Sequence, residues 1–274
     1  MKITTLVENT SIEENIGSEH GLSIHIQTEA ANILLDSGLG DLFFHNANVL
    51  GVDIAEVDYL VLSHGHNDHG GGFSTFLERN DQGKILVQES AFDNYYSLHK
   101  EGDPSYIGLD QALADHERIE TIGKDHTIIP GIRVFSGIEL TESRPTTNYG
   151  LLIKVAGELK DDDFSHEQYL VIEEGDKVVL ITGCSHNGIV NIVKGAIDYL
   201  GRTPDVILGG FHLSNPYWDT SEDEDTIDQI GQFLLETGAK YYTGHCTGQA
   251  AYERLKDNMG DQIDYLPGGS VIEI

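Results

Sequence analysis

Three histidines and one aspartate lie within six residues of the chain, at His64, His66, Asp68 and His69. The apolar residues 58–62 directly before them predict a short buried strand, and the glycines after them open a predicted helix. The four side chains are therefore expected on a loop at a strand's carboxyl end, where rigid scaffolds commonly place chemistry. Neutral imidazole and carboxylate are ligands that zinc, iron and manganese accept. One such loop can reach two metal ions, because His64 and His66 project to one side and Asp68 and His69 lie further round the turn.

More residues of metal-ligand type follow or precede predicted strands later in the chain: His166, Cys184, His186, His212, His245 and Cys246. If these strands share one sheet, their carboxyl ends share one rim, and the side chains converge on the first loop. A two-metal centre needs such a set, with three or four protein ligands for each ion and open positions for water. Each histidine could instead be a surface or packed residue. For His166 both interpretations stay open, because the three aspartates beside it are typical of a solvated loop.

Composition excludes several classes of partner. Lys and Arg total 16 against 46 Asp and Glu, a formal net charge of −30, which argues against nucleic acid and anionic membranes as partners. A small anionic substrate stays compatible with this charge, since metal ions reverse the local sign at a site. The N-terminal segment lacks the apolar run of a signal peptide, and no stretch approaches the length of a membrane span. We expect a cytoplasmic protein, and we expect Cys184 and Cys246 to act as ligands or buried thiols instead of forming a disulfide.

The order of predicted elements indicates a layered α/β fold. Strands are predicted at residues 2–7, 21–27, 31–35, 58–62, 84–87, 151–156, 169–173, 177–182, 205–208 and 240–243, with closing strands within 262–274. Helices are predicted at residues 43–50, 73–80, 90–98, 187–200, 226–237 and 249–259. Residues 99–147 carry only weak strand signals. We predict a single domain over residues 1–274 with an insertion at about 99–147.

The pattern H-x-H-x-D-H at 64–69 resembles the metallo-β-lactamase superfamily, as does the Asp-Ser-Gly at 36–38. Five segments together resemble one branch of it, named for dihydropterin-ribofuranosyl-aminobenzene phosphate synthase, an enzyme of methanopterin biosynthesis. They are residues 6–10, 63–72, 182–191, 209–213 and 244–248. The resemblance covers nearly the whole chain and implies a four-layer αβ/βα sandwich.

The resemblance also implies a ligand set. His64, His66 and His166 would serve the first metal, and Asp68, His69 and His245 the second. The superfamily expects a bridging aspartate where this chain has Cys184. That thiol could bridge, could bind one metal, or could leave the bridge to hydroxide.

Three side chains are given catalytic or supporting roles. Asp68 is the expected proton relay, and His212 the expected donor to a developing oxyanion or leaving group. His186 and His212 are extra to the superfamily pattern, so we interpret them as substrate-facing or as supporting the ligands. The thiol of Cys246 is expected to be buried.

These assignments favour a metal-dependent hydrolase that attacks an ester, lactone or phosphoester with hydroxide held at a dinuclear centre. The alternative is the synthase reaction, which condenses a dihydropterin pyrophosphate with an aminobenzene ribofuranosyl phosphate. A third class is an iron redox or sensor protein on the same fold, although diiron redox relatives usually carry Glu in place of His66. Two divalent ions are expected, zinc first and manganese or iron as alternatives. The expected partners are a small anionic substrate and a second copy of the chain in a homodimer.

Overall fold

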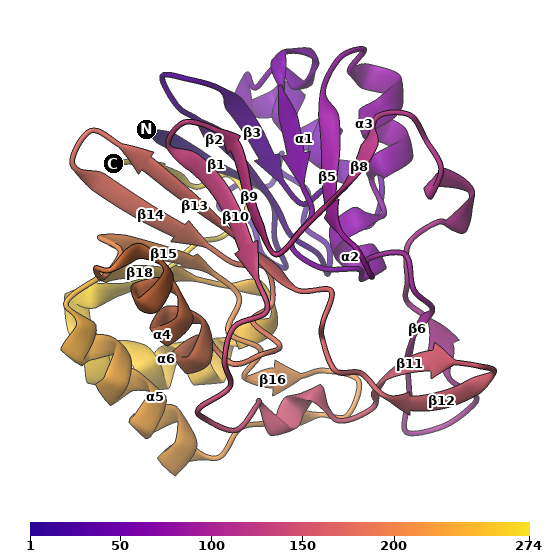
Figure 1. Cartoon of the computed structure of the whole chain (residues 1–274). Helices are drawn as coiled ribbons and strands as arrows, with labels where there is room; N and C mark the ends of the chain where they lie inside the picture. The colour runs from indigo at the N-terminus through magenta and orange to yellow at the C-terminus, as the bar shows by residue number, and fades with distance from the viewer.

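Two seven-stranded sheets face each other, and helices cover the outer face of each, in a computed structural model that describes residues 1–274 (Figure 1). The first sheet has the order β20 (Val271–Glu273), β1 (Lys2–Val7), β2 (Ser23–Gln27), β3 (Asn32–Leu35), β4 (Tyr59–Val61), β5 (Lys84–Gln88) and β8 (Ile119–Ile122). The second has the order β9 (Asp125–Ile129), β10 (Ile132–Ser136), β13 (Gln168–Glu174), β14 (Lys177–Ile181), β15 (Val206–Gly209), β18 (Lys240–Thr243) and β19 (Ile263–Tyr265).

The helices follow the strands that they cover. Helices α1 (Leu42–Leu50), α2 (Asn67–Gly70) and α3 (Phe73–Arg79) belong to the first half. Helices α4 (Ile189–Leu200), α5 (Glu224–Thr237) and α6 (Gln249–Met259) lie against the second sheet, in orange and yellow in Figure 1. Short 3-10 turns occur at Ile54–Glu56, Gln111–Leu113, Thr146–Asn148, His245–Thr247 and Gly260–Gln262.

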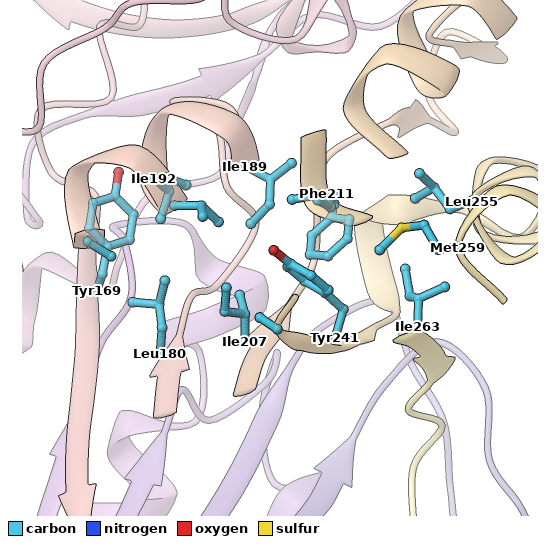
Figure 2. Close-up of a cluster of buried hydrophobic side chains, with 14 of the residues drawn as sticks. Tyr169, Leu180, Ile189, Ile192, Ile207, Phe211, Tyr241, Leu255, Met259 and Ile263 are labelled. Carbon is cyan, nitrogen blue, oxygen red and sulfur yellow. The ribbon is translucent and has the colours of Figure 1, made fainter. Parts of the chain in front are cut away.

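Alternating side chains on the strands hold the four layers together. In β14, Val178 and Leu180 belong to the core under helices α4 to α6, while Val179 and Ile181 belong to the core between the two sheets. Successive side chains of a strand point to opposite faces, so one apolar strand contributes to two cores at once. Figure 2 shows the helix-side core, which extends from Leu180 of β14 across Tyr241 and Phe211 to Leu255 of α6. A third core lies between the first sheet and its helices. The predicted fold class is therefore confirmed.

One predicted helix is wrong. Residues 90–98 form turns followed by strand β6 (Tyr95–Ser97) instead of a helix. Backbone bonds from Ala91 to Gln88 and from Asp93 to Ser90 close the turns, and the hydroxyl of Tyr95 donates to the carbonyl of Ser90. Adjacent aromatic residues after Asp and Asn favour a turn and strand over a helix.

The region predicted as an insertion at about 99–147 is partly built into the sheets. Strand β8 forms the edge of the first sheet, and β9 and β10 lie at the edge of the second. A smaller sheet stands outside both, in the order β12 (Glu158–Asp161), β11 (Leu151–Val155), β6 and β7 (Ser105–Tyr106), at the lower right of Figure 1. A two-stranded ribbon, β16 (Ser214–Asn215) with β17 (Thr220–Ser221), lies near it. None of the helices has the length and apolar character that crossing a membrane requires.

A buried histidine in β2 makes stability depend on pH. His25 is 8% exposed, and burial, helped by the charge of Lys2, lowers its pKa to about 4. In the unfolded chain His25 binds a proton near pH 6.5, whereas in the folded protein it does so only near pH 4. The free energy of unfolding is therefore highest above pH 6.5 and falls as the pH is lowered towards 4. Replacing His25 by Gln should remove roughly 1–3 kcal/mol of this acid-induced loss in unfolding free energy.

The measurement is urea unfolding of both proteins across that pH window. His45→Gln, at an exposed position of α1, is the matched control and should behave as the unsubstituted protein. Identical acid slopes for His25→Gln and His45→Gln would contradict the assignment.

Candidate metal centre

The predicted ligand residues gather where several strands of both sheets end. The loops after β3 and β4 meet the loops after β14, β15 and β18 at one rim, beside a cleft of about 270 Å³. The histidine, cysteine and aspartate side chains there form several groups whose ligand atoms lie within 4.8 Å of one another. Their members include His20, His64, His66, Asp68, His69, Cys184, His186, His212, His245 and Cys246.

The first group consists of His64, His66 and His186, all buried. The hydroxyl of Ser63 donates to Asp36 and therefore accepts from Nδ1 of His64, at 2.8 Å. The Nε2 atom of His64 is then an unprotonated lone pair, 3.3 Å from Nε2 of His186. Two lone pairs at that separation repel each other unless a cation lies near both.

The other two histidines of this group also have Nε2 available for a ligand. The amide of Asn148 donates to the carbonyl of His186 and accepts from its Nδ1 at 2.8 Å, which leaves Nε2 of His186 free. The Nε2 atom of His66 is buried without any hydrogen-bond partner. An orphaned buried nitrogen is costly unless a ligand satisfies it. This group therefore fits a metal ion, and it includes His186, which the sequence pattern had not assigned as a ligand.

The second group brings together Asp68, His69 and His245. Asp36 accepts from Nδ1 of His69 at 2.6 Å, and Asn9 accepts from Nδ1 of His245 at 2.8 Å. Their Nε2 atoms, 3.2 Å apart, lie 3.5 and 3.4 Å from Oδ2 of Asp68. Hydrogen bonds on the far nitrogen are the usual way in which proteins orient histidine ligands.

Cys184 lies between the two groups. Its Sγ is 3.1 Å from Nε2 of His69, and it shares ligand-distance groups with His64 on one side and with His245 and Cys246 on the other. Burial raises the pKa of this thiol well above its usual range. A bound cation would deprotonate it outright. The thiol of Cys246 is buried, as expected, and lies 3.4 Å from the carbonyl of Cys184.

The carboxylates make the cluster a site for positive charge. Burial alone lowers the pKa of His69, but the charges of Asp68 and Asp36 raise it to about 9. Burial alone raises the pKa of Asp68, and the neighbouring His69, His245 and His20 hold it well below its usual range. Both carboxylates therefore favour a positive charge between them. Without a metal ion, the additional proton on His69 provides that charge.

Backbone constraints explain the glycine next to the cysteine. A Cβ atom at Gly183 would collide with the side chain of Ser63. Asp36 and His245 adopt left-handed φ angles of 57° and 51°, and the carboxylate of Glu8 accepts from the backbone N–H of His245 at 2.5 Å. Such strained positions persist when surrounding contacts fix them, and they cluster at functional sites.

His166 has a different place from the one expected. The backbone N–H of Gly65 donates to its Nδ1 at 2.8 Å, so the ring proton is on Nε2, which donates to Asp162 at 3.1 Å. Both nitrogens are thus occupied by protein, which speaks against a metal ligand. His166 instead orients Asp162, whose Oδ2 lies 3.7 Å from Nε2 of His66. Burial acts to raise the pKa of Asp162, but its contacts with His166 and His66 lower it.

Several residues of the site were given no role from the sequence. Asn9 and Asn148 each orient a histidine that lies far away in the chain, and Asp162 accepts from His166 on its own loop. His20 lies outside every motif, yet its Nε2 is 3.4 Å from Asp68. Only Glu8-Asn9 belonged to a segment that the family pattern had marked.

The match to a family model follows the same residues. Residues 17–192 match the model of the metallo-beta-lactamase superfamily. The chain belongs to that superfamily. Its members usually bind divalent metals, and the groups above could hold them. The family predicted from the sequence is confirmed.

Superfamily relatives align over most of the chain. The protein is 29% identical to the 7,8-dihydropterin-6-methyl-4-(beta-D-ribofuranosyl)-aminobenzene-5'-phosphate synthase of Methanocaldococcus jannaschii, over all of this chain and 96% of that one. It is also 29% identical to an uncharacterized protein of the same organism, over 92% of this chain and 93% of that one. The crystal structure of Tm1679, a metal-dependent hydrolase of the beta-lactamase superfamily, has a TM-score of 0.82 at 28% identity, with 100% and 99% of the two chains covered.

Asp36 should control metal affinity through His69. In Asp36→Asn the amide would donate to Nδ1 of His69, moving the ring proton to Nε2 and removing its lone pair from the second group. We expect zinc affinity to fall about 10- to 100-fold without loss of fold. Competition with a chromogenic chelator measures the affinity, and circular dichroism the fold. Asp41→Asn, at an exposed position, is the control and should bind zinc unchanged.

The metal content of two variants distinguishes the role of His186 from that of His166. His186→Ala should lose the metal of the first group, because two imidazoles remain where three stood. His166→Asn, whose side-chain oxygen can still accept from Gly65, should retain the metal of both groups. Mass spectrometry of metal content after gel filtration decides between them; loss of metal only in His166→Asn would reverse the assignment.

Proposed function

We propose that the protein is a metal-dependent hydrolase that cleaves an ester, lactone or phosphoester at a dinuclear centre. The observation that carries the proposal is the common orientation of His64, His69, His186 and His245. Each has its Nδ1 hydrogen-bonded to a protein acceptor and its Nε2 directed into the cluster. Four separate acceptors leave four Nε2 lone pairs facing one space, which is the arrangement that metal binding requires.

The proposed ligand set divides by group. His64, His66 and His186 would hold one ion, and Asp68, His69 and His245 the other, with Cys184 between them. Imidazole nitrogen and thiolate sulfur favour zinc, whereas manganese prefers oxygen ligands. Zinc is therefore the proposed metal, as the sequence had suggested.

The chemistry of the reaction is shared between the ions and the side chains around them. When bound, a pair of divalent cations lowers the pKa of water and polarises a carbonyl or phosphoryl oxygen. Asp68 stays ionised and partly open to the cleft, so it can accept a proton from water and pass it on. His212 lines the same cleft, and neither of its ring nitrogens has a partner. It can donate to the oxygen on which negative charge develops.

The walls of the cleft narrow the class of substrate. Tyr106, Tyr217 and Leu151 offer apolar surface, and Ser97 and Asn215 offer polar groups, but the lining holds no lysine or arginine. An anionic substrate would therefore rely on the metal ions for its charge compensation. This favours a substrate with a single polarisable or anionic group over one with several phosphates.

The synthase reaction is a second candidate, favoured by the similarity to the M. jannaschii synthase over the full chain. In it the ions would bind the leaving pyrophosphate instead of activating water. The absence of lysine and arginine from the cleft weighs against two phosphorylated substrates. Incubation with each substrate alone and with both together separates the candidates, because only condensation consumes the aminobenzene ribofuranosyl phosphate along with the release of pyrophosphate.

The hydrolase proposal is tested with zinc-loaded protein and three probes: p-nitrophenyl acetate and bis-p-nitrophenyl phosphate, which release coloured p-nitrophenol, and a thiolactone, whose product thiol is detected with a chromogenic thiol reagent. We expect turnover of one class, and a loss of about 100-fold or more in His66→Ala together with loss of metal, because the orphaned Nε2 is the ligand atom removed. His45→Ala should change neither. Full turnover by metal-free His66→Ala would end the proposal.

A further inference from the structure

The side chain of Asn9 contacts two histidines at once, at the end of β1. Its Oδ1 lies 2.8 Å from Nδ1 of His245, and its Nδ2 lies 3.4 Å from Nδ1 of His20. The backbone N–H of Gly21 points to the same Oδ1 at 3.5 Å. Because a backbone N–H only donates, the atom facing Gly21 must be the oxygen, and this fixes which end of the amide faces which histidine.

The fixed amide gives the two histidines opposite tautomers. The oxygen accepts, so His245 carries its proton on Nδ1 and presents a free lone pair at Nε2, as a metal ligand requires. The amide nitrogen donates, so Nδ1 of His20 must accept, and the proton of the neutral His20 ring is on Nε2. Asn9 therefore makes His245 a metal ligand through Nε2 and makes His20 a hydrogen-bond donor through Nε2.

The donor nitrogen of His20 faces the reaction site. Its Nε2 lies 3.4 Å from Oδ2 of Asp68, and the ring lies 4.8 Å from that of His245, centroid to centroid. The side chain is 34% exposed and lines the cleft, where Tyr217 packs edge-on against it at 6.1 Å. It is thus in contact both with the proposed proton relay and with the space that a substrate would fill.

Distance alone would also allow His20 to be a metal ligand, since His20, Asp68 and His245 form one of the ligand-distance groups. The tautomer argues otherwise, because a protonated Nε2 has no lone pair to give. A ligand role would need an acceptor on Nδ1 of His20, and Asn9 offers that atom a donor.

We propose that His20 binds an oxygen of the substrate or its leaving group through Nε2–H, and that Asn9 fixes the tautomer that makes this possible. The inference rests on the proposed function of the metal centre, although its tautomer half can be tested without any turnover. No family motif or comparison assigns a role to His20.

The direct test is ¹⁵N NMR of the histidine rings in zinc-loaded protein, with the signals of His20 assigned from their loss in His20→Gln. We expect a protonated, pyrrole-type Nε2 and an unprotonated, pyridine-type Nδ1. A zinc-shifted Nε2 with a protonated Nδ1 would overturn the proposal, and so would a ring protonated at both nitrogens. This result does not depend on whether the protein is a hydrolase.

Asn9→Asp is the matched variant. A carboxylate still accepts from Nδ1 of His245, so zinc content should be unchanged. It cannot donate to His20, so the His20 proton should move to Nδ1. An unchanged His20 tautomer in Asn9→Asp would contradict the role given to Asn9.

The substrate half is tested with inorganic phosphate as a probe of the zinc-loaded protein. Phosphate should shift the Nε2–H signal of His20, and its affinity should fall about 10-fold in His20→Phe while staying within about 3-fold in His20→Gln, whose amide keeps a donor in place. Zinc content should be the same in all three proteins. Equal phosphate affinity in His20→Phe, or loss of zinc from it, would overturn the proposal. For an ester that the protein hydrolyses, kcat/KM of the three proteins should follow the same order as their phosphate affinities.

Discussion

The buried carboxylate of Asp36 is the contact on which the site depends. It is fully buried at the end of β3, and it accepts from the backbone and the hydroxyl of Ser63 and from the ring of His69. Through Ser63 it also sets the proton of His64. A buried charge of this kind is costly unless every oxygen is satisfied, and here the partners that satisfy it are the histidine loop itself. The same bonds thus stabilise the loop and orient its ligands.

The two sheets repeat one plan around this rim. In the first sheet the pairs from β20 to β3 are antiparallel and the pairs from β3 to β8 are parallel. In the second, the pairs from β9 to β14 are antiparallel and those from β14 to β19 parallel. Each half therefore sends the ends of its parallel strands to the same edge, and ligands from both halves meet there. This repeated plan cannot be recognised in the sequence, because only the pairing directions of the strands reveal it.

Local patterns carried much of the prediction. Residues 64–69 predict a metal-binding loop because four ligand-type side chains lie within six residues. The alternation of apolar residues predicted most of the strands. His186 and His166 were harder, because both follow or precede a strand, and only the partners of their nitrogens separate a ligand from an orienting residue. Asp162 was predicted to lie in a solvated acidic loop, but it is buried beside His66. His20 had no neighbouring motif at all, since its contacts come from residues brought close only by the folded sheets.

The site joins parts of the chain that are far apart: His64 meets His186 across 122 residues, and His69 meets His245 across 176. A cation held between such pairs would act as a cross-link that closes very long loops and is lost only when the two halves separate. The metal would therefore slow the unfolding of the whole protein as well as serve its chemistry. Resistance to proteolysis would then rise and fall with the metal supply of the cell. The metal-loaded protein would therefore persist longer than the metal-free protein.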